Sequence, residues 1–282
     1  MELKNTKIIA EVSSNHSGDM FLAKEFIRIT SLIGADYVKF QSSRYEDLSD
    51  KDDSQAAWIK KTSLSDEDHL ELLEACNKNN IRFLTTCFSI KRIPFLASLG
   101  LQEIKVASPD LLSYAMIEKL SETFSHLILS TGMHSIKEIK TTIDFLLKNQ
   151  INSTLLHSVS LYPTRMEQAS MYKFLWLKDH FPKVGYSNHV GSIEPIKFAM
   201  NHGAEIIESH IKLGSLGPGR TTVWDILPEK FKEVVEYRNT LVQMLGDPVS
   251  LSQEDFLLPE EEEAKVQFVG RWGDNRFDTK KD

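Results

Sequence analysis

The stretch VGYSNHVGSIEPIKFAMNHGAEIIESHIKL (residues 184–213) contains two short β-like runs, the first ending at Asn188 and the second near His210. Between them, residues 193–203 carry apolar side chains at helical spacing and end at Gly203. A strand, a helix and a second strand in this order form the crossover unit of a parallel sheet. The stretch therefore predicts an α/β fold with imidazoles at the ends of two successive strands.

The same alternation extends over most of the chain. The expected strands are 7–12, 35–41, 81–86, 103–108, 126–131, 153–159, 183–188 and 204–211, and the expected helices are 20–34, 66–80, 90–100, 110–122, 135–150, 168–181, 193–203 and 228–245. Eight such units, spaced by roughly 25 to 35 residues, favour a closed (β/α)8 TIM barrel over an open sheet. No glycine-rich dinucleotide fingerprint follows the first strand, which argues against a Rossmann fold. We expect a barrel domain at residues 1–245 and a short C-terminal tail at 246–282.

Composition excludes several classes of function. The chain has 282 residues, 41% of them hydrophobic, which is enough for a full core, and a formal net charge of -7. This acidic balance argues against nucleic acid or an anionic membrane as a partner, although a basic pocket for a small anion remains compatible with it. The two cysteines, Cys76 and Cys87, and an N-terminus without a signal-peptide apolar region indicate a cytoplasmic protein with reduced thiols. No apolar run approaches the roughly 20 residues that span a bilayer.

In a TIM barrel the active site lies at the carboxyl ends of the strands, so polar residues there are candidates. One such residue is more often a solvated or capping side chain, but every expected strand has at least one. Lys39 and Lys105 interrupt apolar runs and therefore require an anionic partner. Lysines beside hydroxyls suit a phosphate or carboxylate ligand. The strand-end residues are Glu11, Asn15, His16, Lys39, Gln41, Thr85, Thr86, Lys105, Ser108, Ser130, Thr131, His157, Ser158, Ser160, Ser187, Asn188, His189, Glu208 and His210.

Eight phrases in this order resemble the sialic acid synthase (N-acetylneuraminate synthase) family: IIAEVSSNHSGD, GADYVKFQ, FLTTCFS, IKVASPDL, LILSTGM, LLHSVSLYP, VGYSNH and IIESHIKL. Each phrase alone is weak, and the combination, which covers roughly residues 7–244, is specific. The resemblance implies a TIM-barrel transferase that condenses phosphoenolpyruvate with an amino-sugar aldehyde such as N-acetylmannosamine. The product would be a nonulosonic acid, and the cofactor a divalent metal, Mn²⁺ or Mg²⁺.

Carried over residue by residue, the resemblance implies a site. His189 and His210 match the family's metal ligands, where strand-end histidines would otherwise be expected only to bond the backbone. Lys39 and Lys105 match the lysines that bind phosphoenolpyruvate, and Glu11 and Glu208 the glutamates close to the reactants, so these four are the expected catalytic residues. The expected substrate-binding residues are Asn15, His16, Gln41, Thr86, Ser108, Ser130, Ser160, Tyr162, Ser187 and Asn188.

Departures from the family pattern are also visible. Asn188 stands where the family usually has aspartate, and Cys87 where it has proline. The segment at 213–228, with Arg220 and Asp225, differs in length and residues and is expected to alter the choice of sugar. Family members generally continue into a β-rich domain that, in a homodimer, covers the partner's site; residues 246–282 resemble the connector to that domain. We expect a homodimer. Three alternatives are open for the tail and the cover: Arg271, Trp272 and Arg276 cover the site, the tail is frayed, or a separate polypeptide supplies the cover.

Two other functional interpretations of the sequence remain open. A barrel of the same superfamily can use another aldose or a phosphorylated aldose, which would need further cations, with Arg44, Arg165 and Arg220 as candidates. A non-catalytic sugar-binding or assembly subunit is the alternative of another class. The presence of Glu11 and of both lysines and both histidines argues against this second alternative.

Overall fold

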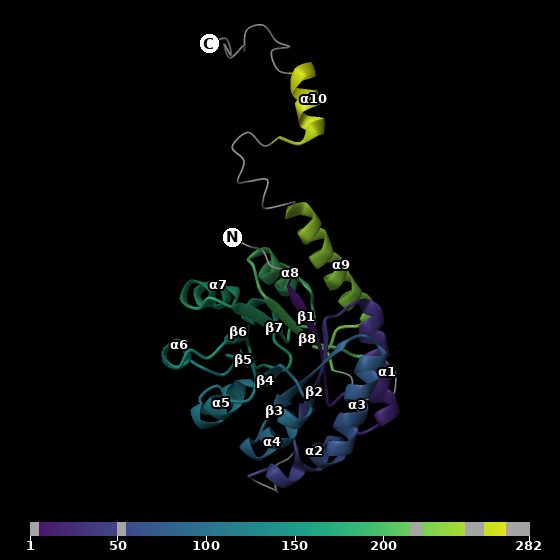
Figure 1. Ribbon diagram of the computed structural model, residues 1–282, viewed down its shortest axis with the longest axis vertical. Coiled ribbons are helices and arrows are strands. Elements are labelled where there is room, and N and C mark those ends of the chain that lie inside the picture. Colours follow the sequence, from purple (N-terminus) through teal and green to yellow (C-terminus); the bar gives the residue numbers. More distant parts are fainter. Residues whose placement is uncertain (1–5, 50–54, 215–221, 246–256, 269–282) are drawn as a thin grey trace. The chain divides into compact units, whose positions relative to one another are not determined.

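Eight parallel strands close into a barrel in the order β1 to β8, which confirms the predicted TIM barrel (Figure 1). The computed structural model describes residues 6–49, 55–214, 222–245 and 257–268. The strands are β1 Lys7–Ser13, β2 Tyr37–Ser42, β3 Arg82–Cys87, β4 Glu103–Val106, β5 His126–Ser130, β6 Ser153–Ser158, β7 Val184–Asn188 and β8 Ile206–His210. Each occupies the position expected from its apolar run.

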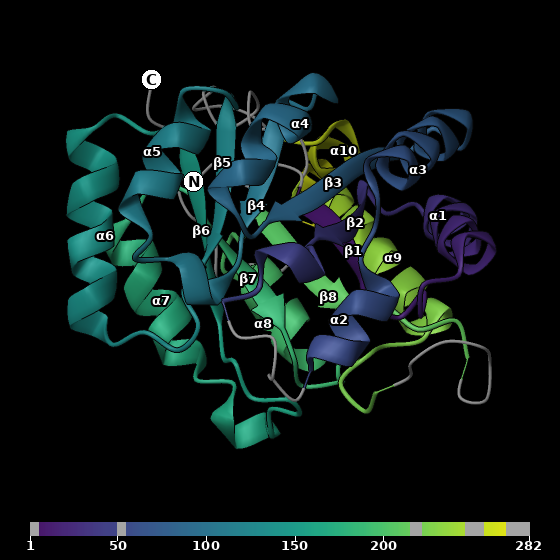
Figure 2. The same ribbon diagram turned by 90° about the horizontal axis from the view of Figure 1, so that it is seen from below.

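Helices surround the barrel, with α5, α6 and α7 on one side of the strands and α1 and α3 on the other (Figure 2). Capping residues determine where these helices begin and end. The Ser65 hydroxyl and the Asp68 carboxylate form a capping box at the start of α3, and Gly34 ends α1 in the left-handed conformation at φ 87°. The helices are α1 Met20–Ile33, α2 Ala56–Thr62, α3 Asp66–Lys78, α4 Ile93–Ser98, α5 Tyr114–Ser121, α6 Ile136–Lys148, α7 Met171–His180, α8 Glu194–Asn201, α9 Pro228–Leu245 and α10 Pro259–Phe268.

Several helices differ from the expectation: α4 and α7 begin three residues later than expected, and α10, in the expected tail, was not predicted. The helix expected at 110–122 begins only at Tyr114, because Ser108–Asp110 form a 3-10 turn with Pro109 in it. Helix α2, in the connection between β2 and α3, was not expected, since its seven residues are too few to show a clear helical period.

The core has two parts. The larger part lies between the strands and the surrounding helices and includes Val38, Phe40, Leu72 and Phe174, all buried. The smaller part lies inside the barrel and consists of Ile9, Tyr37, Leu84, Ile128, Leu156 and Ile206. These six side chains fill the barrel interior, so a ligand can enter only above them, at the carboxyl ends of the strands.

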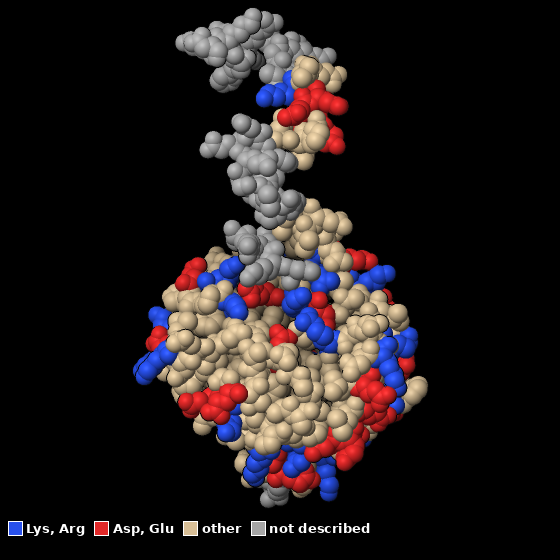
Figure 3. Space-filling view, in the orientation of Figure 1, with Lys and Arg blue, Asp and Glu red and all other residues tan. Residues whose placement is uncertain are grey.

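The chain divides into two compact units, Leu3–Val242 with the barrel, and Gln243–Asp282 with the first two residues. In the second unit, the glutamates of α10 at 260–263 are exposed, as expected for a solvated acidic run. No helix in the described ranges is long and apolar enough to cross a membrane. On the face drawn in Figure 3, acidic and basic side chains alternate around the periphery, so this face presents no broad basic surface for nucleic acid.

Candidate active site

A ring of polar side chains lies directly above the apolar interior of the barrel. Side chains of a strand alternate in direction, so the residue two positions after an inward-facing one also faces inward. Two positions after the six apolar interior residues come Glu11, Lys39, Thr86, Ser130, Ser158 and Glu208. The remaining two strands add Lys105, paired in register with Thr86, and Ser187, paired with Glu208. The strand period and the barrel closure together collect polar groups from all eight strands.

The charged members of the ring pair with one another. The Lys39 ammonium lies 2.5 Å from Glu11 Oε2 and 3.6 Å from Glu208 Oε2, and it donates a hydrogen bond of 2.8 Å to Thr86 Oγ1. All three charged side chains are buried. Burial opposes the charge of Lys39, but the two carboxylates outweigh it and raise the pKa of the lysine. Lys39 is therefore cationic in the unliganded protein.

Lys105 has no carboxylate this close. Its ammonium donates to Ser130 Oγ at 2.5 Å and to the Val106 carbonyl at 2.9 Å. Burial lowers the pKa of Lys105 to about 8. Burial also opposes ionisation of Glu208, but the ammonium groups of Lys105 and Lys39 hold the pKa of this carboxyl at about 2. An anionic ligand beside Lys105 would supply the charge partner that the lysine lacks.

Three serine hydroxyls converge on Gly132, where only the absence of a side chain leaves room for them. A Cβ atom at this glycine would lie 2.2 Å from Ser160 Oγ and 2.8 Å from the hydroxyls of Ser108 and Ser158. The buried Ser160 hydroxyl has no hydrogen-bond partner among the described residues. Since buried polar groups are normally satisfied, this hydroxyl indicates a missing polar ligand. The space beside Gly132 therefore has the donors that a phosphate needs, with Lys105 and Ser130 on the adjacent strands.

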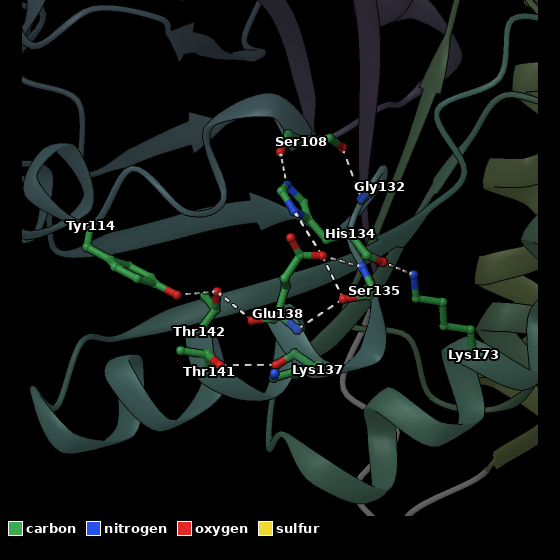
Figure 4. A network of polar contacts seen from close by, with 10 residues as sticks. All are labelled: Ser108, Tyr114, Gly132, His134, Ser135, Lys137, Glu138, Thr141, Thr142 and Lys173. Carbon is green, nitrogen blue, oxygen red and sulfur yellow. Dashed lines mark hydrogen bonds and ion pairs between the residues drawn. The ribbon is translucent and has the colours of Figure 1, made fainter.

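A network behind this space holds Ser108 in position (Figure 4). The Gly132 N–H donates to Ser108 Oγ at 3.2 Å, and His134 Nε2 donates to the Ser108 carbonyl at 2.8 Å. The His134 carbonyl in turn accepts a hydrogen bond of 2.8 Å from Lys173 of α7. These bonds tie the β4 and β5 strand ends to α7, so the hydroxyl of Ser108 is preorganised.

His189 and His210 meet where β7 and β8 end. Their ring centroids lie 5.3 Å apart, and Tyr162 packs against His189 at 4.5 Å. His189 Nδ1 donates to the Val159 carbonyl at 2.7 Å, which leaves Nε2 with a free lone pair. Burial lowers the pKa of both histidines, that of His210 to about 3, so both imidazoles are neutral. A neutral imidazole can bind a metal, and His189 also has one ring nitrogen fixed by a backbone carbonyl.

Known proteins resemble this chain over most of its length. Residues 26–250 match the model of the NeuB family. The chain belongs to the NeuB family. It is 33% identical to the N,N'-diacetyllegionaminic acid synthase of Campylobacter jejuni, over 88% of this chain and 79% of that protein. It is 32% identical to the pseudaminic acid synthase of Helicobacter pylori, over 87% of this chain and 77% of that protein.

A solved structure supports the same assignment. The N-acetylneuraminic acid synthetase of Leptospira borgpetersenii, crystallised with citrate, superposes with a TM-score of 0.82 at 28% identity, over 95% of this chain and 94% of that one. This NeuB-family protein is therefore a phosphoenolpyruvate-condensing transferase of nonulosonic acid synthesis.

Most of the expected site residues of this NeuB-family protein line one cavity of about 550 Å³. His16 and Asn188 do not. His16 is buried against Phe40, and its Nδ1 accepts from the Gly18 N–H. The expected residues that line the cavity are Glu11, Asn15, Lys39, Gln41, Thr86, Lys105, Ser108, Ser130, Ser160, Tyr162, Ser187, His189, Glu208 and His210.

Asn188 is fully buried on the face of β7 opposite to that of Ser187, and it is hydrogen-bonded there. Its amide nitrogen donates to the Ser192 carbonyl at 3.0 Å and to Ser209 Oγ at 3.3 Å, and its oxygen accepts from Tyr186. A carboxylate could not make the two donations. The asparagine thus fits the packing of β7 in this chain, and it holds the backbone next to His189.

Several cavity residues were not expected from the sequence. Apart from Ser13, the last residue of β1, they come from connections between strands and helices, where no period marks an inward position: Ser13, Ser14, Gln55, Phe88, Ala107, Pro109, Met133, Thr222 and Trp224. Ser158 is one of the three serines whose hydroxyls lie close to Gly132. It was among the strand-end candidates, but it was not among the expected substrate-binding residues.

Of the extra arginines expected for a phosphorylated acceptor, Arg44 and Arg165 are described, and neither lines the cavity. Arg44 lies 3.7 Å from Asp47 and lines a separate pocket, and Arg165 is exposed and pairs with Glu167 at 2.5 Å. Arg220, Arg271, Trp272 and Arg276 lie outside the described residues.

Proposed function

We propose that this protein condenses phosphoenolpyruvate with an N-acetylated amino-sugar aldehyde resembling N-acetylmannosamine, giving a nonulosonic acid and phosphate. The observation that carries the proposal is the polar ring, in which two buried lysines and a group of hydroxyls face one cavity. A small dianionic or trianionic ligand would compensate the lysines, and phosphoenolpyruvate carries both a phosphate and a carboxylate.

Phosphoenolpyruvate is proposed to bind with its phosphate beside Gly132. Lys105, Ser108, Ser130 and Ser160 would contact phosphate oxygens there, because all four line this part of the cavity and the Lys105 ammonium bonds to the Ser130 hydroxyl. Lys39 would contact the same ligand from β2. The preorganised hydroxyls lower the entropic cost of binding, since their positions are set by strands and by the His134 network.

The histidines provide the proposed metal site. Among the described residues, no group of three or more His, Cys, Asp or Glu side chains could hold a metal ion. His189 and His210 would therefore hold Mn²⁺ or Mg²⁺ together with oxygen atoms of water and substrate, which fits an exchangeable ion. When bound, the ion would polarise the aldehyde and stabilise the negative charge that develops on its oxygen.

A buried carboxylate is assigned the proton transfer in this reaction. The methylene carbon of phosphoenolpyruvate attacks the aldehyde carbon and forms the new C–C bond, while a water oxygen adds to the enol carbon. Glu11 is proposed to accept the proton of that water. Burial raises the pKa of Glu11, which makes it a stronger base than a solvated glutamate. Cleavage of the C–O bond then releases phosphate and leaves the keto group.

An uncharged acceptor is favoured over a phosphorylated one. Among the described residues that line the cavity, the only lysine or arginine side chains are Lys39 and Lys105. Both are assigned to phosphoenolpyruvate, so a second phosphate would be left without a cation in that part of the site.

Product analysis tests the proposal. The protein would be incubated with phosphoenolpyruvate, Mn²⁺ and a panel of aldoses that includes N-acetylmannosamine, its 6-phosphate, mannosamine and arabinose 5-phosphate. We expect a product mass equal to acceptor plus pyruvate, with the N-acetylated, unphosphorylated sugar preferred. Efficient condensation of a phosphorylated aldose alone would refute the proposed acceptor.

A further inference from the structure

One aromatic side chain of the cavity has no role in the chemistry above. Trp224 lies in the connection between β8 and α9, lines the cavity and is partly exposed. Its ring centroid is 5.4 Å from that of Tyr162, and Tyr162 also packs against His189 and, at 6.4 Å, His210. An aromatic wall therefore extends from the two histidines toward the mouth of the cavity.

The backbone around Trp224 is anchored from the barrel side. The Ile226 N–H donates to the His210 carbonyl at 2.9 Å, and the Lys212 N–H donates to the Ile226 carbonyl at 3.1 Å. The buried Asp225 carboxylate accepts from the Thr222 N–H at 2.8 Å and from the Asn15 amide at 3.2 Å. These bonds on both sides of Trp224 hold the turn that carries it beside the end of β8.

A close backbone contact anchors the same segment from β7. A Cβ atom on Gly191 would lie 2.4 Å from the Val223 carbonyl oxygen and 3.2 Å from the Trp224 Cα. Gly191 also has φ +75°, where a side chain is strained. Only glycine therefore permits the β7 connection to pack against the segment that carries Trp224.

A fixed, partly exposed indole in a cavity is an apolar surface that lacks a partner. Burying it against a ligand is favourable, because it removes apolar area from water, and its rigidity keeps the entropic cost low. The polar ring at the bottom of the cavity is assigned to phosphoenolpyruvate, so the surface next to the histidines and Trp224 is left for the other substrate. A sugar offers few apolar groups of this size besides its C–H surface and an N-acyl methyl group.

We infer that Trp224 binds the N-acyl group and adjacent C–H surface of the acceptor and thereby selects acylated amino sugars over free amino sugars. The inference rests on the proposed function for the position of phosphoenolpyruvate. Tyr162 forms the inner part of the wall and Trp224 the outer part. The N-acyl group thus lies away from the reacting aldehyde, and the aldehyde points toward the histidines.

Equilibrium binding tests the inference without requiring turnover. Binding of N-acetylmannosamine and of mannosamine to the intact protein, in the presence of phosphoenolpyruvate and without metal, would be measured by saturation-transfer NMR and calorimetry. We expect Trp224→Ala to weaken N-acetylmannosamine binding about 10-fold, which corresponds to about 1.4 kcal/mol. Mannosamine binding should change little, and Trp224→Phe should recover most of the loss.

The controls separate a local effect from unfolding. Trp176→Ala removes an indole from α7, where it stacks on His180, and should leave sugar binding unchanged. Gly191→Ala should reproduce the Trp224→Ala effect by displacing the segment. Phosphoenolpyruvate affinity should stay at the wild-type value in Trp224→Ala, which shows that the barrel is intact.

The outcomes distinguish this inference from the proposed function. If Trp224→Ala binds N-acetylmannosamine as tightly as the wild type does, the inference is refuted, even when condensation is observed. Failure of the wild type to bind any N-acylated sugar refutes it as well. If sugar binding depends on Trp224 but no aldose is condensed, the inference stands and the proposed function fails.

Discussion

Replacing Gly132 by alanine is the most direct perturbation of the proposed phosphate site. Gly132 does not have a left-handed backbone conformation, so alanine is sterically allowed by the main chain. The added methyl group would nevertheless lie 2.2 Å from Ser160 Oγ and 2.8 Å from two further hydroxyls. Because these contacts are shorter than van der Waals distance, at least one hydroxyl must move out of the space. The substitution fills the site without removing any of its polar side chains.

The expected loss follows from the interactions displaced. A hydrogen bond from a hydroxyl to a charged phosphate contributes roughly 1.5 to 3 kcal/mol, so losing one raises the KM for phosphoenolpyruvate about 10-fold to 150-fold. Overpacking also lowers stability by about 1 to 3 kcal/mol. Steady-state kinetics with varied phosphoenolpyruvate, inhibition by inorganic phosphate and thermal unfolding would measure both effects. The KM for the acceptor should change much less.

Gly100→Ala is the matched control. Gly100 has φ +71°, and a methyl group added to it would have no neighbouring atom within 4 Å, so alanine strains the backbone there without touching the cavity. This variant should lose stability and keep the wild-type KM. If Gly132→Ala keeps both the wild-type KM for phosphoenolpyruvate and the wild-type inhibition by phosphate, the phosphate does not bind beside Gly132.

Three further predictions concern the metal, the charge and the support of the site. His189→Ala and His210→Ala should each weaken Mn²⁺ binding measured by calorimetry while circular dichroism stays unchanged; full affinity in both would remove the metal from these histidines. The kcat/KM for phosphoenolpyruvate should fall as the pH rises through about 8, because Lys105 then loses the proton that gives it its charge. Lys105→Arg should flatten this alkaline limb, and an unchanged limb would assign it to another group. His134→Ala should raise the KM for phosphoenolpyruvate about 2-fold to 12-fold without lowering kcat, since one neutral hydrogen bond to the Ser108 carbonyl is lost; recovery in His134→Gln, which can still donate, would show that the bond and not the ring matters.

The barrel and its polar ring were predictable because both depend on periodic patterns. Lys39 follows the buried Tyr37 by two positions and Glu208 follows Ile206 by two, so the strand period alone turns them inward. Applied to Leu156, the same two-residue spacing predicts that Ser158 faces inward. The resemblance added what the period lacks, namely which histidines and serines matter.

The rest of the site depends on connections, where no period exists. Trp224 and Thr222 reach the cavity only because the segment after β8 pairs with the barrel again at Ile226. Asn188, expected in the site, follows the inward-facing Ser187, so strand alternation turns it to the other face of β7, where it bonds to Ser192 and Ser209. Such contacts join distant parts of the chain, and a single sequence does not record them.

The two parts of the cavity also differ in how freely they can change. In the ring, Lys39 is buried between Glu11 and Glu208. Replacing one of these three residues leaves an uncompensated buried charge, which typically lowers the free energy of unfolding by about 3 to 5 kcal/mol. Trp224 and Tyr162 are partly exposed and pair with no charge, so their replacement costs far less stability. Changes of acceptor preference are therefore expected to arise in the connection after β8, while the phosphoenolpyruvate contacts stay constant. A variant library restricted to residues 222–224 and selected for condensation of a different acylated sugar should yield active proteins with unchanged KM for phosphoenolpyruvate. The same diversity introduced at Glu11 and Lys39 should yield mainly unstable or inactive proteins.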